Sequence, residues 1–172
     1  MRSQELRRMR FESAQLACLT FLVASGVPGC SPEVRPAVFT GDFCLNDLSD
    51  LTSVTETIKS LAASQGMTVH DRSLAASGEL RQIATESPNS PDWYSKPVLM
   101  LTVDNVSGSG MTATNAGLNN QIAVTIFGGR DHNEAQEFAT LALSRLRAQW
   151  DVREQSLGSS ISPDKRCALL SR

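Results

Sequence analysis

The sequence predicts an α+β domain, a two-layer sandwich in which two main helices cover one face of a mainly antiparallel sheet of four to five strands. Apolar residues recur at three- to four-residue spacing in two long segments, near 47–65 and 131–150, as they do in amphipathic helices. Short runs of aliphatic and β-branched residues before, between and after these segments predict the strands.

The first half of the domain begins with a predicted strand over 37–43 (AVFTGDF). A helix is predicted from Asp47 to Gln65, and Gly66 provides a stop signal. A second strand follows over 67–73 (MTVHDRS). The next stretch, 74–97, stays unassigned, because its LRQIA segment fits a helical turn or a strand and its end (SPNSPDWYSKP) is a loop.

The second half contains the strand expected near the centre of the sheet, 98–104 (VLMLTVD). A long Gly/Asn/Ser/Thr link over 105–120 is predicted to join it to the strand 121–127 (QIAVTIF), whose apolar residues alternate. We expect these two strands to pair as an antiparallel hairpin with a long loop.

The clearest helix is predicted to start at Asp131, a suitable capping residue, and Glu134 completes a capping-box pattern. A last strand is expected over about 151–157, followed by the tail SSISPDKRCALLSR. The resulting order, β-α-β, an unassigned stretch, then β-β-α-β, resembles the ferredoxin-like arrangement.

The charge is unevenly distributed along the chain. Four of the 16 basic residues lie in the first ten positions, so the part from Cys30 onward has 12 basic and 16 acidic residues, a net charge of −4. A mildly acidic body argues against nucleic-acid binding, which requires clustered Lys and Arg. It suits a basic protein partner, or simply solubility.

The amino terminus has the layout of an export signal. Residues 1–12 are polar and net basic, and residues 16–27 are an uncharged apolar stretch. Twelve residues are too few to span a bilayer, which needs about 20, but they suit the apolar region of a secretory signal. Either Met1 or Met9 can serve as the start.

The apolar stretch ends in Val27-Pro28-Gly29-Cys30, which resembles the lipobox of bacterial lipoproteins. Val27, Gly29 and Cys30 match that pattern, while Pro28 takes the place of the usual small residue. The resemblance implies cleavage before Cys30 and a diacylglyceryl group on its sulfur. Cleavage near Ala24-Ser25-Gly26 and an uncleaved, buried segment are the alternatives.

The lipobox resemblance divides the chain into a signal peptide (1–29), a lipidated cysteine with a short tether (30–36) and a single domain (37–172). Ser31 resembles the residue that follows the cysteine in outer-membrane lipoproteins. We therefore expect an exported protein, lipid-anchored in the cell envelope at the outer membrane and facing the periplasm.

Two cysteines, Cys44 and Cys167, remain in the exported part once Cys18 and Cys30 are assigned. An even pair in an oxidising compartment predicts a disulfide that ties the two ends of the domain together. Two free thiols or an intermolecular bridge are the alternatives.

No catalytic, cofactor or metal motif is evident, so we expect no enzyme activity, cofactor or metal. His70 and His132 each have an acidic neighbour, but adjacent residues of a strand point to opposite faces, and Asp131 already serves as a cap. The sequence Gly108–Ala113 loosely matches a dinucleotide-binding turn but leads into a strand instead of a helix.

Two loops are the candidate binding regions. Trp93 and Tyr94 are aromatic residues in a polar loop, which is typical of protein interfaces and equally of packing onto a sheet. In the 105–120 link, polar residues suited to a protein or glycan partner include Asn105, Ser109 and Asn115, although a merely flexible loop has the same composition.

Together these features favour a non-enzymatic lipoprotein whose extracytoplasmic domain binds a protein partner. Such a protein would be an accessory of envelope assembly or secretion, or an immunity or inhibitor protein. A lipoprotein that binds a small ligand or cell-wall glycan is the alternative, and an enzyme is less favoured.

Overall fold

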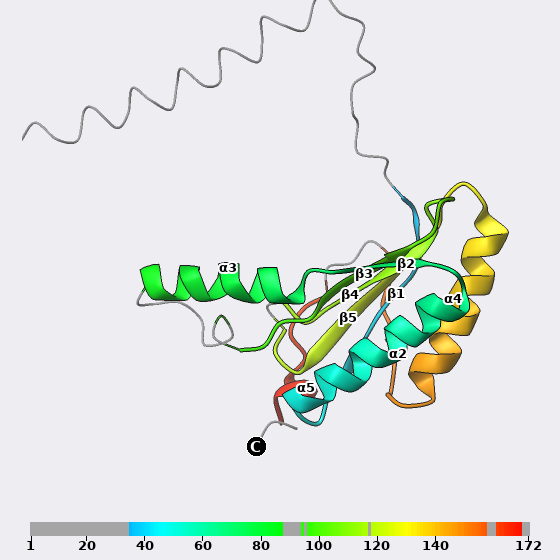
Figure 1. Ribbon diagram of the computed structural model, residues 1–172. Helices are drawn as coiled ribbons and strands as arrows, with labels where there is room; N and C mark the ends of the chain where they lie inside the picture. Colours follow the sequence, from blue (N-terminus) through cyan, green and yellow to red (C-terminus); the bar gives the residue numbers. More distant parts are fainter. Residues whose placement is uncertain (1–34, 88–93, 95, 117, 158–160, 170–172) are drawn as a thin grey trace, which may run out of the picture. The chain divides into compact units, whose positions relative to one another are not determined.

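A single antiparallel sheet organises the domain (Figure 1). The computed structural model describes residues 35–87, 94, 96–116, 118–157 and 161–169. Within them six strands lie in the order β2-β3-β4-β5-β1-β6. Their bounds are β1 Ala37–Cys44, β2 Thr68–Asp71, β3 Met100–Asp104, β4 Gly110–Thr114, β5 Gln121–Phe127 and β6 Arg153–Glu154. The predicted α+β class is confirmed, with six strands in place of four or five.

The connections between strands explain the ferredoxin-like character. Every neighbouring pair is antiparallel, so β1 runs parallel to β2, and β5 runs parallel to β6. A helix links each parallel pair, α2 after β1 and α4 after β5. Leaving out β3 and β4 gives the order β6-β1-β5-β2 of two interlocked split β-α-β units. The β3–β4 hairpin is therefore an insertion within a ferredoxin-like sheet, between β2 and β5.

Helices α2 and α4 pack together on one face of the sheet, as predicted (Figure 1). The bounds of the helical segments are η1 Leu48–Asp50, α2 Leu51–Ser64, α3 Ser73–Glu86, α4 His132–Arg147 and α5 Lys165–Leu169. Asp47 caps the first turn through a capping box with Asp50. Gly66, with φ of 61°, follows the end of α2.

Asp131 caps α4 by accepting hydrogen bonds from the backbone N–H groups of Asn133 and Glu134. The Glu134 side chain does not complete the predicted capping box. Its carboxylate instead accepts hydrogen bonds from the side chains of Asn105 and Ser107, in the turn between β3 and β4. The residue thus joins α4 to a distant turn.

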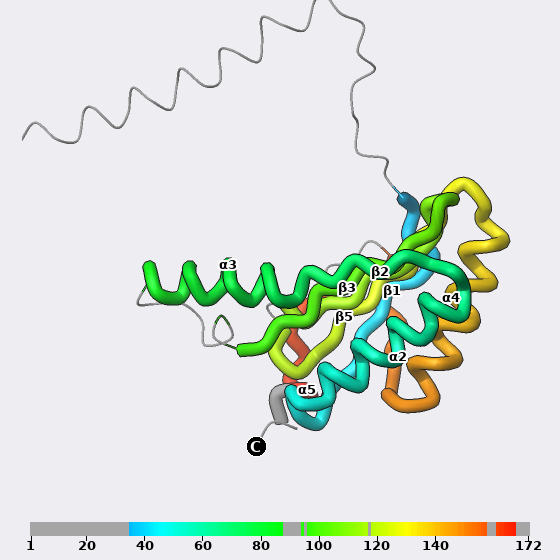
Figure 2. Tube along the Cα trace, in the orientation of Figure 1, coloured from blue at the N-terminus to red at the C-terminus, as the bar shows by residue number. Residues whose placement is uncertain are grey.

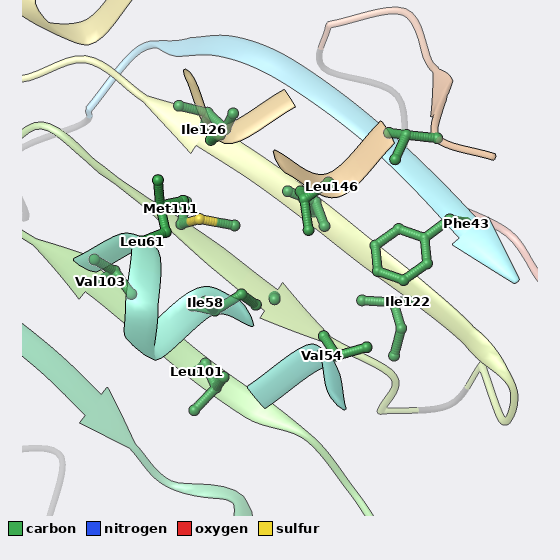
Figure 3. Close-up of a cluster of buried hydrophobic side chains, with 14 of the residues drawn as sticks. Phe43, Val54, Ile58, Leu61, Leu101, Val103, Met111, Ile122, Ile126 and Leu146 are labelled. Atoms are coloured by element: carbon green, nitrogen blue, oxygen red, sulfur yellow. The ribbon is translucent and has the colours of Figure 1, made fainter. Parts of the chain in front are cut away.

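The core lies between the sheet and the two helices (Figure 3). Alternate residues of each strand point toward the helices, as a period of two requires. Phe43 at the end of β1 is fully buried and stacks on Trp150, with ring centroids 5.0 Å apart. Other fully or almost fully buried core residues are Val54, Ile58, Leu101, Val103, Met111, Ile122, Ile126 and Leu146.

The predicted link over 105–120 is wrong in one respect, because it contains the strand β4. Met111 and Ala113 face the helices and are buried, whereas Thr112 and Thr114 on the other face are only half-buried. The M-T-A-T alternation holds one large apolar residue, too weak a signal to identify a strand. As a result β3 and β5 do not form the predicted hairpin, since β4 lies between them.

The unassigned stretch after β2 forms the helix α3. The strand predicted over 67–73 ends earlier, at Asp71, because Ser73 already begins that helix. The strand predicted over 151–157 is likewise shorter, with only Arg153 and Glu154 in β6. The remaining predicted strands and helices are confirmed to within a few residues.

A buried polar network holds the carboxyl-terminal segment on the far face of the sheet, the face opposite α2 and α4. The Asp42 side chain is 1% exposed and accepts hydrogen bonds from the side chains of Gln121, Arg153 and Gln155. Arg153 also forms an ion pair with Asp164, at 2.5 Å from Nη1 to Oδ2. The Asp164 backbone N–H in turn donates to the Gln121 side chain at 2.7 Å.

A disulfide between Cys44 and Cys167 completes this arrangement. We call the bridge and the network of Asp42, Gln121, Arg153 and Asp164 the C-terminal latch. The predicted bridge is present, with a Cα–Cα distance of 5.0 Å. The pKa of the Asp164 carboxyl lies below its usual value, chiefly because the carboxylate accepts the Arg166 backbone N–H; partial burial opposes this, and Arg153 adds to it. Asp164 is therefore ionised, and paired with Arg153, at neutral pH.

Replacing both Cys44 and Cys167 with Ser should lower the free energy of unfolding by up to about 5 kcal/mol, because the bridge spans 123 residues. Urea denaturation of the oxidised protein and of the double variant measures the difference. Wild-type protein unfolded in the presence of a reductant should match the double variant. A double variant as stable as oxidised wild type would show that the bridge adds no stability.

Candidate functional site

The two histidines lie in different parts of the domain and do not form one site. His70 is on the edge strand β2, where its Nε2 atom lies 3.3 Å from Asp104 Oδ1. The other Asp104 oxygen pairs with Arg35 at 3.2 Å. His70 and Asp71 point to opposite faces, as strand alternation predicts, so the acidic partner of His70 comes from the neighbouring strand. Sequence reasoning missed this contact because it depends on strand register.

His70, Asp104 and Arg35 form a group of polar side chains at the surface of the domain. The His70 side chain is 55% exposed, so a proton acceptor at this position would act in contact with bulk water. Across the far face, Thr102, Thr112 and Thr125 follow His70 in register. These hydroxyl groups make the middle of that face polar, and threonine is in any case favoured in strands.

His132 lies in the first turn of α4, where its ring nitrogen is 3.3 Å from the Gln136 side chain. The Gly108–Ala113 motif leads into β4 instead of a helix, so the backbone lacks the turn-to-helix geometry of a dinucleotide site. Within the described ranges no three His, Cys, Asp or Glu side chains are grouped closely enough to hold a metal ion.

A hollow of about 380 Å³ lies beside the C-terminal latch, lined in part by Asn46, Trp150 and Arg166. It is mixed in character, because the Arg153 and Arg166 guanidinium groups that border it already pair with Asp164. With its cations paired within the protein, the hollow offers a bound anion little uncompensated positive charge.

The predicted binding residues of the 105–120 segment serve internal structure. The Asn115 side chain, 3% exposed, accepts the Leu99 backbone N–H at 2.7 Å and donates to backbone carbonyl groups. Ser109 is fully buried and accepts the Gly129 backbone N–H. Asn105 is half-buried and bonded to Ser107 and Glu134. The polar composition of this segment therefore reflects the satisfaction of backbone groups.

Of the aromatic pair in the preceding loop, Tyr94 is half-buried and Trp93 lies outside the described residues. This loop follows directly after helix α3, which is the least packed of the long helices. Of its 14 residues only Ala76 and Ser77 are buried. Helices in proteins gain most of their stability from packing, so a long helix with so little burial is unusual.

Two serines attach α3 to the sheet. The Ser73 hydroxyl accepts the Met100 backbone N–H at 3.0 Å, and the Ser77 hydroxyl accepts the Val98 backbone N–H at 3.3 Å. At four-residue spacing the two side chains lie on one helix face. The two hydroxyl groups take the place of backbone acceptors that a longer β2 would have offered. The hydrogen bonds along this edge of β3 therefore continue through serine side chains.

Asp71, at the end of β2, strengthens the attachment of α3 to the sheet. Partial burial tends to raise the pKa of Asp71, but hydrogen bonds from Ser73 and the Lys59 ammonium at 3.2 Å outweigh it, so the pKa lies below its usual value. The start of α3 is thereby fixed, while most of the helix lies beyond this attachment (Figure 2).

Two of the four large exposed apolar residues of the described chain lie on α3, which we call the α3 arm (Ser73–Glu86). Leu74 is 89% exposed and Ile83 45% exposed, and the large exposed apolar side chains elsewhere in the described chain are Val106 and Leu157. The exposure of Leu74 is notable because it lies on a helix with so little burial, where a partner could supply the missing contacts. The arm and the adjoining Tyr94 loop are therefore the candidate binding site. The residue pattern that could have revealed the arm is the Ser73–Ser77 spacing with Leu80 and Ala84.

Comparison with models of known protein families and with curated protein sequences finds no match to this chain.

Substituting Ser77 with Ala should destabilise the attachment of the arm, because the buried Val98 N–H loses its acceptor. A buried donor left unsatisfied costs about 1–3 kcal/mol. Amide hydrogen exchange should show faster exchange at Val98 and throughout α3. As a control, Thr85→Ala should have little effect, because the Thr85 hydroxyl bonds only within the last turns of the helix. Equal exchange in wild type and Ser77→Ala would mean that the serine does not hold the arm.

Proposed function

We propose that this protein is a lipoprotein, anchored to the cell envelope through a lipid on Cys30, whose folded domain binds a protein partner through the α3 arm. The observation that carries the partner-binding part is the exposure of Leu74 on a helix that buries only two residues. The anchor rests on the sequence, where an apolar stretch without charges ends in the lipobox-like residues 27–30. No helix of the described chain has the length and apolarity needed to cross a bilayer.

A protein is the class of partner that suits the arm. Its surface combines apolar Leu74 and Ile83 with the charged residues Glu79, Arg81 and Glu86, and apolar contacts beside polar and charged groups are typical of protein interfaces. Leu74 and Ile83 are nine positions apart and so lie on different sides of the helix. A partner that covers both must enclose the arm instead of lying flat on one side.

The arm lies at the opposite end of β3 from the point where the tether meets the sheet. Arg35 pairs with Asp104, the last residue of β3, whereas Ser73 and Ser77 contact the backbone just before and at its start (Figure 1). With the chain anchored through Cys30, this arrangement directs the arm away from the lipid. A partner can then reach the arm from the side that faces away from the membrane.

Intact mass spectrometry of protein extracted from membranes tests the anchor. We expect a chain that starts at Cys30 and carries the added mass of a diacylglyceryl group. In a Cys30→Ser variant the lipid mass should be lost and the signal retained. A mature chain without lipid, or one cut near residue 25, would exclude this anchor.

Partner binding is tested with a Leu74→Asp variant, which places a charge in the apolar contact. Crosslinking in intact envelopes identifies the partner, and titration with the purified partner measures Kd. We expect Leu74→Asp to weaken binding at least ten-fold, equivalent to the loss of one apolar contact of about 1.4 kcal/mol or more. Leu157→Asp is the matched control, an exposed leucine outside the arm, and should bind like wild type. Equal weakening by both variants would rule out the arm as the binding surface.

A further inference from the structure

The first residues of the described chain are held firmly against the sheet. Arg35 pairs with Asp104, and its guanidinium lies 5.3 Å from the centre of the Phe127 ring. The Pro36 carbonyl accepts the Gly128 backbone N–H at 2.8 Å. The position at which the tether joins the domain is therefore fixed. We call this part of the domain the Arg35 end.

A turn of the β3–β4 hairpin, residues 105–109, lies beside Arg35. A Cβ atom added to Gly108, whose φ is 86°, would lie 3.7 Å from Arg35 Nε. The turn is held by its own polar groups, because the Asn105 side-chain oxygen accepts the backbone N–H groups of Ser107 and Ser109, at 3.0 Å each. Glu134 binds the side chains of both Asn105 and Ser107 from α4. The turn therefore has one defined conformation.

This rigid turn holds an apolar side chain out in water. Val106 is fully exposed, at 107% of its reference area, although its two neighbours in the chain are tied into the turn. Arg130 lies beside the turn, because the Arg130 backbone N–H donates to the Ser107 carbonyl at 3.0 Å, and the Arg130 side chain is exposed. An apolar tip with an arginine beside it is a combination found where proteins contact the surface of a bilayer.

From these contacts we propose that the 105–109 turn at the Arg35 end rests on the lipid surface, with the Val106 side chain inserted between the headgroups. This inference rests on the proposed lipid anchor at Cys30. Only four residues separate Cys30 from Arg35, and even a fully extended chain of five steps reaches about 18 Å. The Arg35 end is thus the part of the domain that the anchor keeps nearest the bilayer.

One valine cannot hold a free protein on a membrane, and the charge at this end does not add much attraction. Asp104 neutralises Arg35, and Asp131 and Glu134 lie near Arg130 in the chain. The anchor changes this balance, because it makes the contact intramolecular and so raises the effective concentration of lipid at the turn. Burial of Val106 then favours this orientation over others about ten-fold, with little dependence on salt.

The test uses the mature, lipidated protein, isotopically labelled, in nanodiscs of phosphatidylcholine with and without a gadolinium-chelating lipid. Paramagnetic broadening of amide signals reports distance from the headgroups. We expect the strongest broadening at residues 105–108 and 130–132 and little in the α3 arm. Val106→Asp should reduce the contrast between the two regions several-fold, whereas Leu74→Asp at the opposite end should leave it unchanged.

The outcomes separate this inference from the proposed anchor, because the intact mass of the same sample is measured. If lipid is present on Cys30 but broadening is uniform, or strongest in another region, the contact is overturned while the anchor stands. If Val106→Asp leaves the pattern unchanged, the valine does not orient the domain. A sample without lipid on Cys30 overturns the anchor and this contact together.

Discussion

The register of β1 is the constraint on which the rest of the domain depends. This strand is hydrogen-bonded to β5 on one side and β6 on the other, and alternation along it sends successive side chains to different layers. Phe43 lies in the apolar layer under α2 and α4, while its neighbours Asp42 and Cys44 belong to the C-terminal latch on the other face. A shift of one residue in register would place a carboxylate in the apolar core and a phenyl ring against Arg153. The helix layer and the latch therefore specify the same register independently.

The sequence predicted those elements whose signals are local. β5 and α4 carry clear periodicity of two and of 3.6 residues, and Asp131 marks the start of α4 through chemistry confined to one turn. β4 was missed because Ala113 and the threonines beside it give little apolar contrast. The sequence of α3 does not identify a helix, because the helix is attached by two serine hydroxyls instead of an apolar stripe. The partners of these two serines, Val98 and Met100, lie 21 and 27 residues further along the chain.

The candidate site was predictable only in part, for the same physical reason. The Cys44–Cys167 bridge followed from counting cysteines, but the network around Asp42 could not be foreseen, since it assembles from four distant segments. Asn105, Ser109 and Asn115 have the composition of a binding loop, yet buried backbone N–H groups require acceptors too, and these side chains supply them. The α3 arm emerges as a candidate only once burial is known, because exposure of Leu74 is a property of the fold.

The 123-residue separation of the bridged cysteines has a consequence for how the chain acquires its structure. β1 is the first strand of the described domain, and Cys167 lies in its last helix, α5. At about 5–20 residues per second, the strand waits roughly 6–25 s before its covalent partner exists. During that interval the Asp42 carboxylate lacks Arg153, and β1 lacks β6 along one edge. The β6 edge of β1 and its covalent partner therefore both come from the carboxyl-terminal part of the described chain, so this side of the sheet can close only after that part has been made.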